Sequence, residues 1–285
     1  MLLCVGDLYE EVLVQASSPP MRGIDTSVRS ARVRGGSAAN VAALSGELGR
    51  PARFVGQVGD DSIGRTLVAD IKRRGVDAMV HQIGGTGVSI SIAGGGARSR
   101  LVDRGASRRL HNIDPGVLDG VSWIYLAASA FTEDPMASAI DRLLGEIRDR
   151  RVTLTIGGPS SADLQSIGRQ EFLELIAATR PDSVVLNSSE HASLGLDPRS
   201  PIPGVANTVV TAGPRPTLTV DSEANATAVE VRHVEGIRDS TGVGDAFVAG
   251  YLASRSTGAD SASACNAGHR LSAKVITRLG PTSVG

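Results

Sequence analysis

The sequence has little lysine, few aromatic residues and only two cysteines, and these shortages exclude several classes of protein. Lys72 and Lys274 are its only lysines, and neither follows glycine in a Gly-Lys-Ser/Thr pattern. A P-loop is therefore excluded, and the lysine motif of eukaryotic protein kinases is missing as well. Cys4 and Cys265 lie in apolar or small-residue runs, which indicates buried thiols in a reducing compartment and not a disulfide framework.

Long apolar runs and an excess of charge of one sign are also missing. The chain has no stretch of about eighteen or more apolar residues and no basic segment near Met1, so we expect no membrane span, no signal peptide and a cytoplasmic location. The formal net charge of -1 argues against a nucleic-acid or membrane partner. The five histidines are scattered, and no Gly-x-Gly-x-x-Gly follows the first predicted strand, which disfavours a dinucleotide fold.

The chain does contain a glycine-rich stretch that predicts the start of a helix. Polar residues lead into Gly242-Val243-Gly244, and from Val243 apolar residues recur with the period of a helix buried along one face. A helix start offers unpaired N–H groups and the positive end of the macrodipole, which suit an anion such as phosphate. Asp245 is then either a base for a hydroxyl that attacks this phosphate, or a first-turn residue that complements the dipole.

Two sequence signatures resemble those of one enzyme family. Residues 239–247, Asp-Ser-Thr-Gly-Val-Gly-Asp-Ala-Phe, resemble the carboxy-terminal signature of the ribokinase-like (PfkB) carbohydrate kinases. Residues 35–42, Gly-Gly-Ser-Ala-Ala-Asn-Val-Ala, and residues 56–64 resemble the amino-terminal one, about 200 residues earlier. The similarity runs from Asp7 to Gly280. The resemblance implies an ATP-dependent kinase that phosphorylates a hydroxymethyl group of a small sugar or sugar derivative.

The order of predicted elements indicates an α/β fold. Repeated strand and helix units after residue 112 imply a mainly parallel sheet with helices on both faces. The resemblance implies one ribokinase-like three-layer α/β/α domain over residues 1–285. It also implies a small β lid from residues 10–34 and 86–104, with turns at 17–20 and 94–96, that often forms a homodimer contact. Strands are predicted at 2–5, 52–58, 123–126, 152–156, 183–186 and 208–213, and helices at 38–48, 62–74, 135–150, 171–179 and 261–277.

Polar residues at two predicted element ends are candidates for substrate binding. Asp7 follows the apolar strand 2–5, and ligands of open α/β sheets bind at such ends, although Asp7 alone could be only a turn residue. Asn40 lies in the first turns of a predicted helix, where asparagine is mildly unfavourable and its amide could read a sugar hydroxyl. The resemblance implies that Asp7, Gly36 and Asn40 bind the sugar.

The nucleotide side is predicted mainly by the resemblance. Asn187-Ser-Ser-Glu190 matches the family's Asn-x-x-Glu motif, which is linked to the Mg²⁺ of Mg-ATP, and its oxygens suit a hard cation. The same residues also fit a helix cap. In the Thr-x-Gly turn of residues 211–213, Pro214 follows where a second glycine is common in the family. This departure bears on the affinity for the nucleotide and on which nucleotide is used. Further implied nucleotide contacts are Thr211, Gly213 and Asn266.

A second cation is implied by the resemblance alone. The terminal loop of the family, here residues 277–283, often holds a monovalent cation, usually potassium, together with the segment before the glycine turn. Carbonyl and hydroxyl oxygens suit such an ion. The implied ligands are Asp239, Thr241 and Gly280.

The mechanism that follows assigns catalysis to the start of the predicted helix. Asp245 accepts the proton of the sugar hydroxyl as the γ-phosphoryl group moves across, and because the transition state is loose, an aspartate of ordinary pKa is sufficient for this step. The N–H groups around Gly242, Val243 and Gly244 stabilise the charge on its oxygens. An alternative of another class is a catalytically idle sugar or nucleotide sensor, which has no need of such a base.

The identity of the sugar stays open at this stage. Ser37-Ala38 stands where ribokinase usually has lysine and glycine, so ribose is one candidate beside fructose, a keto-deoxy sugar acid or a nucleoside. Aromatic residues make up 3% of the chain, which argues against a nucleoside, although Tyr9 or Phe131 could supply a stacking ring. The lid arginines could pair with an anionic substrate or lie on the surface; they are Arg98, Arg100 and Arg104.

Overall fold

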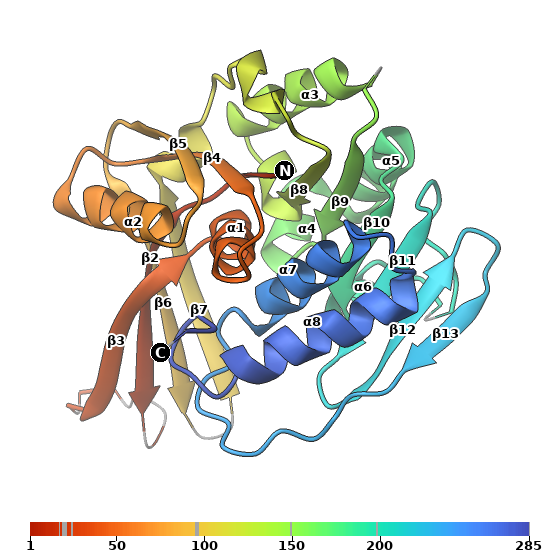
Figure 1. Ribbon diagram of the computed structural model, residues 1–285. Coiled ribbons are helices and arrows are strands. Elements are labelled where there is room, and N and C mark those ends of the chain that lie inside the picture. The colour runs from red at the N-terminus through yellow and green to blue at the C-terminus, as the bar shows by residue number, and fades with distance from the viewer. Residues whose placement is uncertain are drawn as a thin grey trace.

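The fold is built around one large sheet whose strands are mostly parallel (Figure 1). The computed structural model describes residues 1–16, 18, 22–23, 25–94, 97–148, 150–197 and 199–284. The nine-stranded sheet has the order β13-β12-β11-β10-β9-β8-β1-β4-β5, in which β12 and β13 pair antiparallel. Its strands are β1 (Leu2–Val5), β4 (Ala52–Val58), β5 (Asp77–Gln82), β8 (Trp123–Ala127), β9 (Thr153–Gly157), β10 (Ser183–Asn187), β11 (Asn207–Ala212), β12 (Arg215–Asp221) and β13 (Ala226–Val229).

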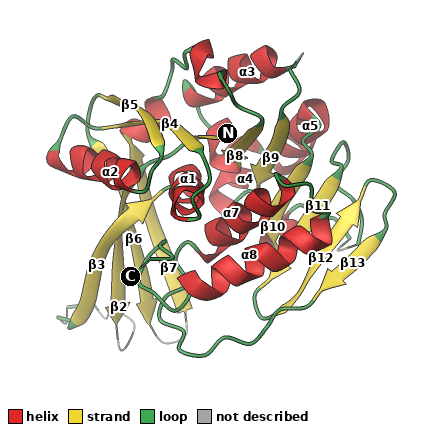
Figure 2. Cartoon of the chain, in the orientation of Figure 1, coloured by secondary structure: helices red, strands yellow, loops and turns green. Residues whose placement is uncertain are grey.

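Helices cover both faces of this sheet and complete the predicted three-layer α/β/α fold, which is confirmed (Figure 2). None of the helices in the described residues has the length and apolar character that a membrane crossing requires. One face carries α1 (Ser37–Glu47), α2 (Ser62–Arg73), α7 (Val243–Arg255) and α8 (Ser261–Val275). The other carries α3 (Met136–Ile147), α4 (Ser161–Ile167) and α5 (Arg169–Thr179), and α6 (Ser188–Ser193) directly follows β10.

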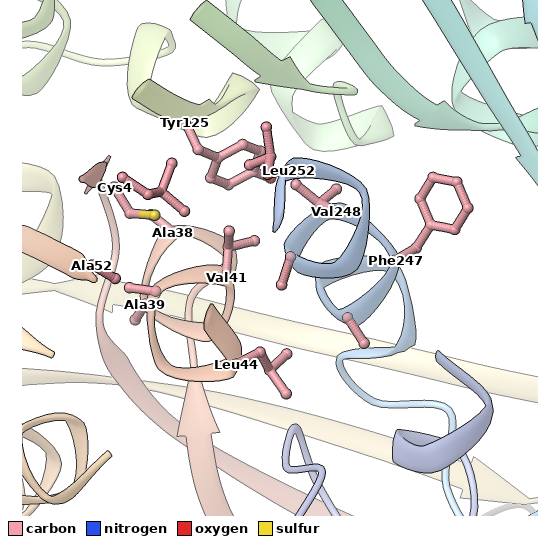
Figure 3. Close-up of a cluster of buried hydrophobic side chains, with 14 of the residues drawn as sticks. Cys4, Ala38, Ala39, Val41, Leu44, Ala52, Tyr125, Phe247, Val248 and Leu252 are labelled. Atoms are coloured by element: carbon pink, nitrogen blue, oxygen red, sulfur yellow. The ribbon is translucent and has the colours of Figure 1, made fainter. Parts of the chain in front are cut away.

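Alternating side chains of the central strand β1 pack into two separate cores. Cys4 faces the layer of α1 and α7, whereas Leu3 faces the opposite layer, as the alternation of side chains along a strand requires. Figure 3 shows the first core, in which Val41 of α1 and Val248 of α7 approach each other. Packing of α1 against α7 brings together the starts of two helices that the sequence places far apart.

A second, four-stranded sheet stands beside the large one, and we call it the lid sheet (Figure 1). Its order is β3-β2-β6-β7. It comes from the two segments predicted to form a lid, although residues 17, 19–21, 24, 95 and 96, which include parts of both predicted turns, lie outside the described ones. The strands are β2 (Tyr9–Ala16), β3 (Val28–Gly35), β6 (Thr86–Gly94) and β7 (Ala97–Gly105).

Some elements differ from the sequence-based expectation. The edge strands β5 and β13 were not predicted, and most of their side chains are at least partly exposed. A strand at a sheet edge that buries few side chains lacks the apolar pattern by which strands are recognised. The helix predicted at 135–150 is shorter, because α3 ends at Ile147.

Candidate active site

A cleft of about 700 Å³ opens between the carboxyl ends of the central strands and the lid sheet. Residues at the ends of β1, β8, β9 and β10 line it, together with the first turns of α1 and α7. Carboxyl ends of parallel strands are where ligands of open α/β sheets bind. The cleft brings together most of the residues predicted from the sequence: Asp7, Gly36, Asn40, Asn187, Glu190, Thr211, Thr241, Gly242, Gly244 and Asp245.

The start of α7 is an open glycine turn that carries a carboxylate. Gly242 precedes the helix with a φ of 75°, and a Cβ there would lie 2.4 Å from the Cβ of Pro281. A Cβ on Gly244 would meet open space, so the helix start is accessible from the cleft. Asp245 lies in this first turn. The turn therefore offers the N–H groups of a helix start to an anion beside a carboxylate.

Both carboxylate oxygens of Asp245 accept hydrogen bonds from α1. Ser37 Oγ donates to Oδ1 over 2.6 Å, and Asn40 Nδ2 donates to Oδ2 over 2.8 Å. Ser37 Oγ also lies 2.8 Å from the hydroxyl of Tyr125, and Asn40 Oδ1 accepts a 3.0 Å hydrogen bond from Nε of the buried Arg34. Hydrogen bonds from Ser37 and Asn40 therefore fix the orientation of the Asp245 carboxylate.

The pKa of Asp245 lies above the ordinary value that would be sufficient for a loose transition state. Burial raises the pKa of this carboxyl, and the hydrogen bonds from Ser37 and Asn40 oppose the rise. The positive charges of Arg100 and Arg34 oppose it as well. A carboxylate with a raised pKa accepts a proton more strongly when it is ionised, which suits the role of a base.

Asp7 is buried at the end of β1 and is held from two sides. Arg104 of β7 donates to Asp7 Oδ1 from Nε over 3.1 Å and from Nη2 over 3.0 Å, and Ser129 Oγ donates to Oδ2 over 3.0 Å. Burial raises the pKa of Asp7, whereas the charge of Arg104 lowers it. Gly36 has a φ of 99°, and a Cβ there would lie 2.1 Å from the carbonyl oxygen of Asp7. Backbone packing against Asp7 thus requires glycine at position 36.

Asn187 and Glu190 form a capping box at the start of α6 and also border the cleft. The Asn187 side chain accepts from the N–H groups of Ser189 and Glu190, and Glu190 Oε2 accepts a 2.8 Å hydrogen bond from the Asn187 N–H. Burial raises the pKa of Glu190 to about 7, and the charges of Asp163 and Asp245 add to the rise. The predicted helix cap is therefore present. The Glu190 carboxyl borders the cleft, and a cation bound there would favour its ionised form.

Comparison with known proteins places this geometry in a family. The profile of the pfkB family carbohydrate kinases matches residues 1–284. The chain belongs to this family. It is therefore a phosphotransferase of the carbohydrate kinase type, as its sequence signatures predicted.

Individual relatives are distant in sequence and close in structure. Probable fructokinase-7 of Arabidopsis thaliana is 25% identical over 286 residues, which cover 88% of this chain and 78% of that protein. The adenosine kinase from Sinorhizobium meliloti has a TM-score of 0.87 at 21% identity, covering 98% of this chain and 94% of that chain. An uncharacterized sugar kinase from Pyrococcus horikoshii in complex with ATP has a TM-score of 0.84 at 20% identity, covering 99% and 94%.

The predicted potassium ligands of this pfkB kinase lie together behind the glycine turn. Asp239 Oδ1 accepts hydrogen bonds from the N–H and the hydroxyl of Thr241 over 3.0 and 2.9 Å, and Oδ2 accepts from the Gly280 N–H over 2.8 Å. No group of three or more His, Cys, Asp or Glu side chains suited to a metal occurs among the described residues. Mg²⁺ is usually held by one or two carboxylates together with phosphates and water, and the cleft-facing Glu190 fits that pattern.

Five predicted residues of the kinase lie outside the cleft lining. Gly213 is exposed in the turn after β11, and Asn266 is exposed on α8, where Nδ2 lies 3.3 Å from the carbonyl oxygen of Ala262. Their nucleotide contacts stay predictions. The others are Val243, Asp239 and Gly280.

Several residues that the sequence analysis did not assign to the site hold Asp7 and Asp245 in place, either directly or through another side chain. Ser37 lies inside the amino-terminal signature, and Arg34 directly precedes it, so both had a signal in their position. Tyr125 and Ser129 had none, because their contacts depend on how the strands pair. Arg104 had been weighed as a substrate ligand, and the structure pairs it with Asp7.

The other residues that the sequence suggested for substrate binding have different surroundings. Arg100 Nη2 donates to the Tyr9 hydroxyl over 2.6 Å, and its Nε lies 3.6 Å from Glu11 Oε1. The Arg98 side chain lies outside the described residues. Of the two rings considered for a nucleobase, Tyr9 lines the cleft and Phe131 is buried in the second core.

Proposed function

We propose that this kinase transfers the γ-phosphoryl group of ATP to the hydroxymethyl group of a small neutral sugar. The observation that carries the proposal is the juxtaposition of the Asp245 carboxylate with the open glycine turn at the start of α7. A site that only held phosphate would gain nothing from a carboxylate beside it. A carboxylate is useful there if it accepts a proton from the attacking hydroxyl.

The residues of the cleft divide the work of the reaction. Asp245, oriented by Ser37 and Asn40, takes the proton of the acceptor hydroxyl. The N–H groups of Gly242 and Gly244 stabilise the charge on the transferred phosphoryl group, whereas the N–H of Val243, also predicted for this role, donates to the Ser240 carbonyl oxygen over 3.3 Å. Because phosphoryl transfer passes through a loose transition state, positioning and charge stabilisation supply most of the rate.

The nucleotide is assigned to the side of the cleft formed by β10 and β11. Asn187 and Glu190 would hold Mg²⁺, which neutralises phosphate charge when bound, and Thr211 would contact the phosphates from the neighbouring strand. Gly213 and Asn266 are proposed for the ribose and adenine by family resemblance. Potassium is proposed at the cluster of Asp239, Thr241 and Gly280.

Charge pairing in the other half of the cleft favours a neutral sugar over a sugar acid. Arg104 is paired with Asp7, and Arg100 lies between the Tyr9 hydroxyl and Glu11. A substrate carboxylate would have to displace these partners. The carboxylate oxygens of Asp7 have lone pairs left to accept from sugar hydroxyls instead, whereas the Asn40 amide is engaged with Asp245 and Arg34.

A nucleoside kinase is the second candidate, because the ring of Tyr9 borders the cleft and could stack on a base. The test is ADP production with Mg-ATP and potassium over fructose, ribose, a keto-deoxy sugar acid and adenosine. Turnover fastest with a neutral sugar supports the main proposal, and turnover fastest with adenosine replaces it by the second. Absence of turnover with the whole panel favours a catalytically idle sensor.

The role of Asp245 is tested separately with Asp245→Asn. This change keeps the shape of the side chain and removes the base, so turnover should fall about 100-fold or more. The melting temperature and the ATP dissociation constant should stay close to those of the wild type. Turnover within a few-fold of the wild type would refute the assignment.

We also propose a cytoplasmic homodimer that associates through the lid sheet. Cys4 and Cys265 are free and buried thiols, which suits a reducing compartment. Ile90 and Leu101 are exposed and lie opposite each other on paired strands of the lid. Neighbouring exposed apolar side chains on a sheet favour association with a second copy.

A further inference from the structure

A second pocket, of about 370 Å³, lies between the lid sheet and α2. It shares Arg34 with the hydrogen-bond chain that reaches Asp245 through Asn40. Its volume falls within the range of about 300–1,000 Å³ that is usual for small-molecule sites. Four arginines line it, namely Arg32, Arg34, Arg73 and Arg74, and the acidic residues of its lining are Glu10 and Asp70.

Three of these arginines crowd around one carboxylate. Asp70 accepts hydrogen bonds from Arg34 and Arg74, and from Arg73 over 3.5 Å. Arg74 has a second partner in Glu47. These three guanidinium groups thus share the carboxylates of Asp70 and Glu47, and the fourth arginine, Arg32, pairs with Glu10. The four arginines of the lining are therefore matched by three carboxylates, which leaves an excess of one positive charge.

The pKa of Arg74 reflects its burial and the nearby charge of Arg34. Burial and the neighbouring charge of Arg34 lower the pKa of Arg74 to about 10, as expected where like charges lie close together. Arg34 is fixed, because its side chain is 3% exposed. Arg32 and Arg73 stand at the mouth of the pocket with side chains 69% and 73% exposed. Arg32 pairs with Glu10 over 2.8 Å and Arg73 lies 3.5 Å from Asp70, so an incoming anion would compete with these carboxylates for mobile, solvent-exposed guanidinium groups.

We propose that this pocket binds a phosphate-bearing anion, either inorganic phosphate or a sugar phosphate, as an effector of the kinase. Guanidinium groups bind phosphate with two parallel hydrogen bonds and keep their charge on burial. Ser62 lines the same pocket and adds a hydroxyl donor. The hydroxyls of Thr66 and Thr282, also in the lining, donate to the Ser62 carbonyl oxygen and to Glu47. The bound anion relieves the repulsion among the arginines.

The position of the pocket links the anion to the lid. Arg32 belongs to the lid strand β3 and Arg73 to the last turn of α2, so an anion between them ties the lid to the core. Opening of a lid often limits product release. On the proposed function, a tied lid slows release, and the anion therefore lowers kcat and the KM for the sugar together.

Binding is tested without any assumption about activity. Titration calorimetry compares inorganic phosphate and fructose 6-phosphate on the wild type, Arg73→Gln and Arg65→Gln, with chloride at matched ionic strength. We expect saturable binding that Arg73→Gln weakens about tenfold or more, since it removes a charged donor. Arg65 is the control, because it lies on the same helix, is 60% exposed and pairs with Asp60 outside the pocket.

Each outcome of the titration decides something. Equal affinity for the two ligands assigns the pocket to phosphate itself, and tighter binding of fructose 6-phosphate that Arg73→Gln weakens assigns it to a sugar phosphate. Binding that is not saturable, or that Arg73→Gln leaves unchanged, overturns the proposal.

Steady-state kinetics then asks whether the anion lowers kcat and the sugar KM in Arg65→Gln and not in Arg73→Gln. An inactive enzyme that still binds phosphate through Arg73 refutes the proposed function and not the pocket.

Discussion

The Ser37 hydroxyl donates a 2.6 Å hydrogen bond to Oδ1 of Asp245, across 208 positions of sequence. The same hydroxyl lies 2.8 Å from the Tyr125 hydroxyl. The proposed base is therefore held by a neutral donor at a position where the ribokinase pattern usually has lysine. A neutral donor lowers the pKa of the carboxylate less than a cation would, so the rise in the pKa of Asp245 that burial causes is only partly offset.

Replacing Ser37 by alanine should shift the pH dependence of turnover. The hydrogen bond from Ser37 lowers the pKa of Asp245, so its loss raises that pKa further. Because the base must be deprotonated, the acid limb of kcat/KM should move to higher pH in Ser37→Ala, and the two enzymes should converge at high pH. A pH–rate profile measures this. Ser193→Ala, which removes an exposed hydroxyl of α6, is the control, and an unmoved acid limb in Ser37→Ala would contradict the role.

Arg104→Gln should weaken sugar binding selectively. The change removes the charge that lowers the pKa of Asp7 and the two hydrogen bonds that orient its carboxylate. We expect the KM for the sugar to rise about tenfold or more, while the KM for ATP changes little. Steady-state kinetics with each substrate varied in turn measures both. Equal changes in the two KM values would indicate a general loss of structure, which Arg65→Gln should not show.

Glu190→Gln should raise the Mg²⁺ requirement. The pKa of Glu190 is raised to about 7, so near neutral pH a large part of this side chain is protonated until a cation binds and favours the charged form. The neutral glutamine should raise the Mg²⁺ concentration for half-maximal rate about tenfold, and in the wild type this concentration should rise as the pH falls through about 7. Asp260→Asn alters the cap of α8 and controls for the loss of a helix cap. An identical Mg²⁺ titration for Glu190→Gln and wild type would speak against the metal role.

Leu101→Glu should dissociate the proposed dimer. Leu101 is 62% exposed on the lid sheet, and in a two-fold contact each new carboxylate would face an apolar patch or its own copy. We expect the dimer dissociation constant to rise about tenfold or more, measured by sedimentation equilibrium. Ile83→Glu changes an exposed apolar residue outside the lid strands and should leave the dimer intact. A wild type that stays monomeric at all concentrations would refute the assembly.

The elements of the fold that the sequence predicted best are those with a local cause. Leu2–Val5 is an apolar run followed by glycine, and Ala52–Val58 is a mainly apolar segment followed by glycine; both are interior strands of the sheet. The start of α7 was readable for the same reason, since Gly242 has a positive φ that glycine adopts without strain. The edge strand β5 was not readable, because its partly exposed side chains carry no clear pattern.

The sequence by itself determined the family and the pieces of the candidate site, because each piece is a short run whose chemistry is local: a glycine turn before a helix, an aspartate after a strand, an Asn-x-x-Glu cap. Only the tertiary structure decided which of these pieces touch. The contacts of Arg34 with Pro281 and of Arg104 with Asp7 join residues 247 and 97 positions apart, and such pairs depend on strand register and helix packing. The raised pKa of Asp245 belongs to this second group, since burial is a property of the folded chain and not of the residue.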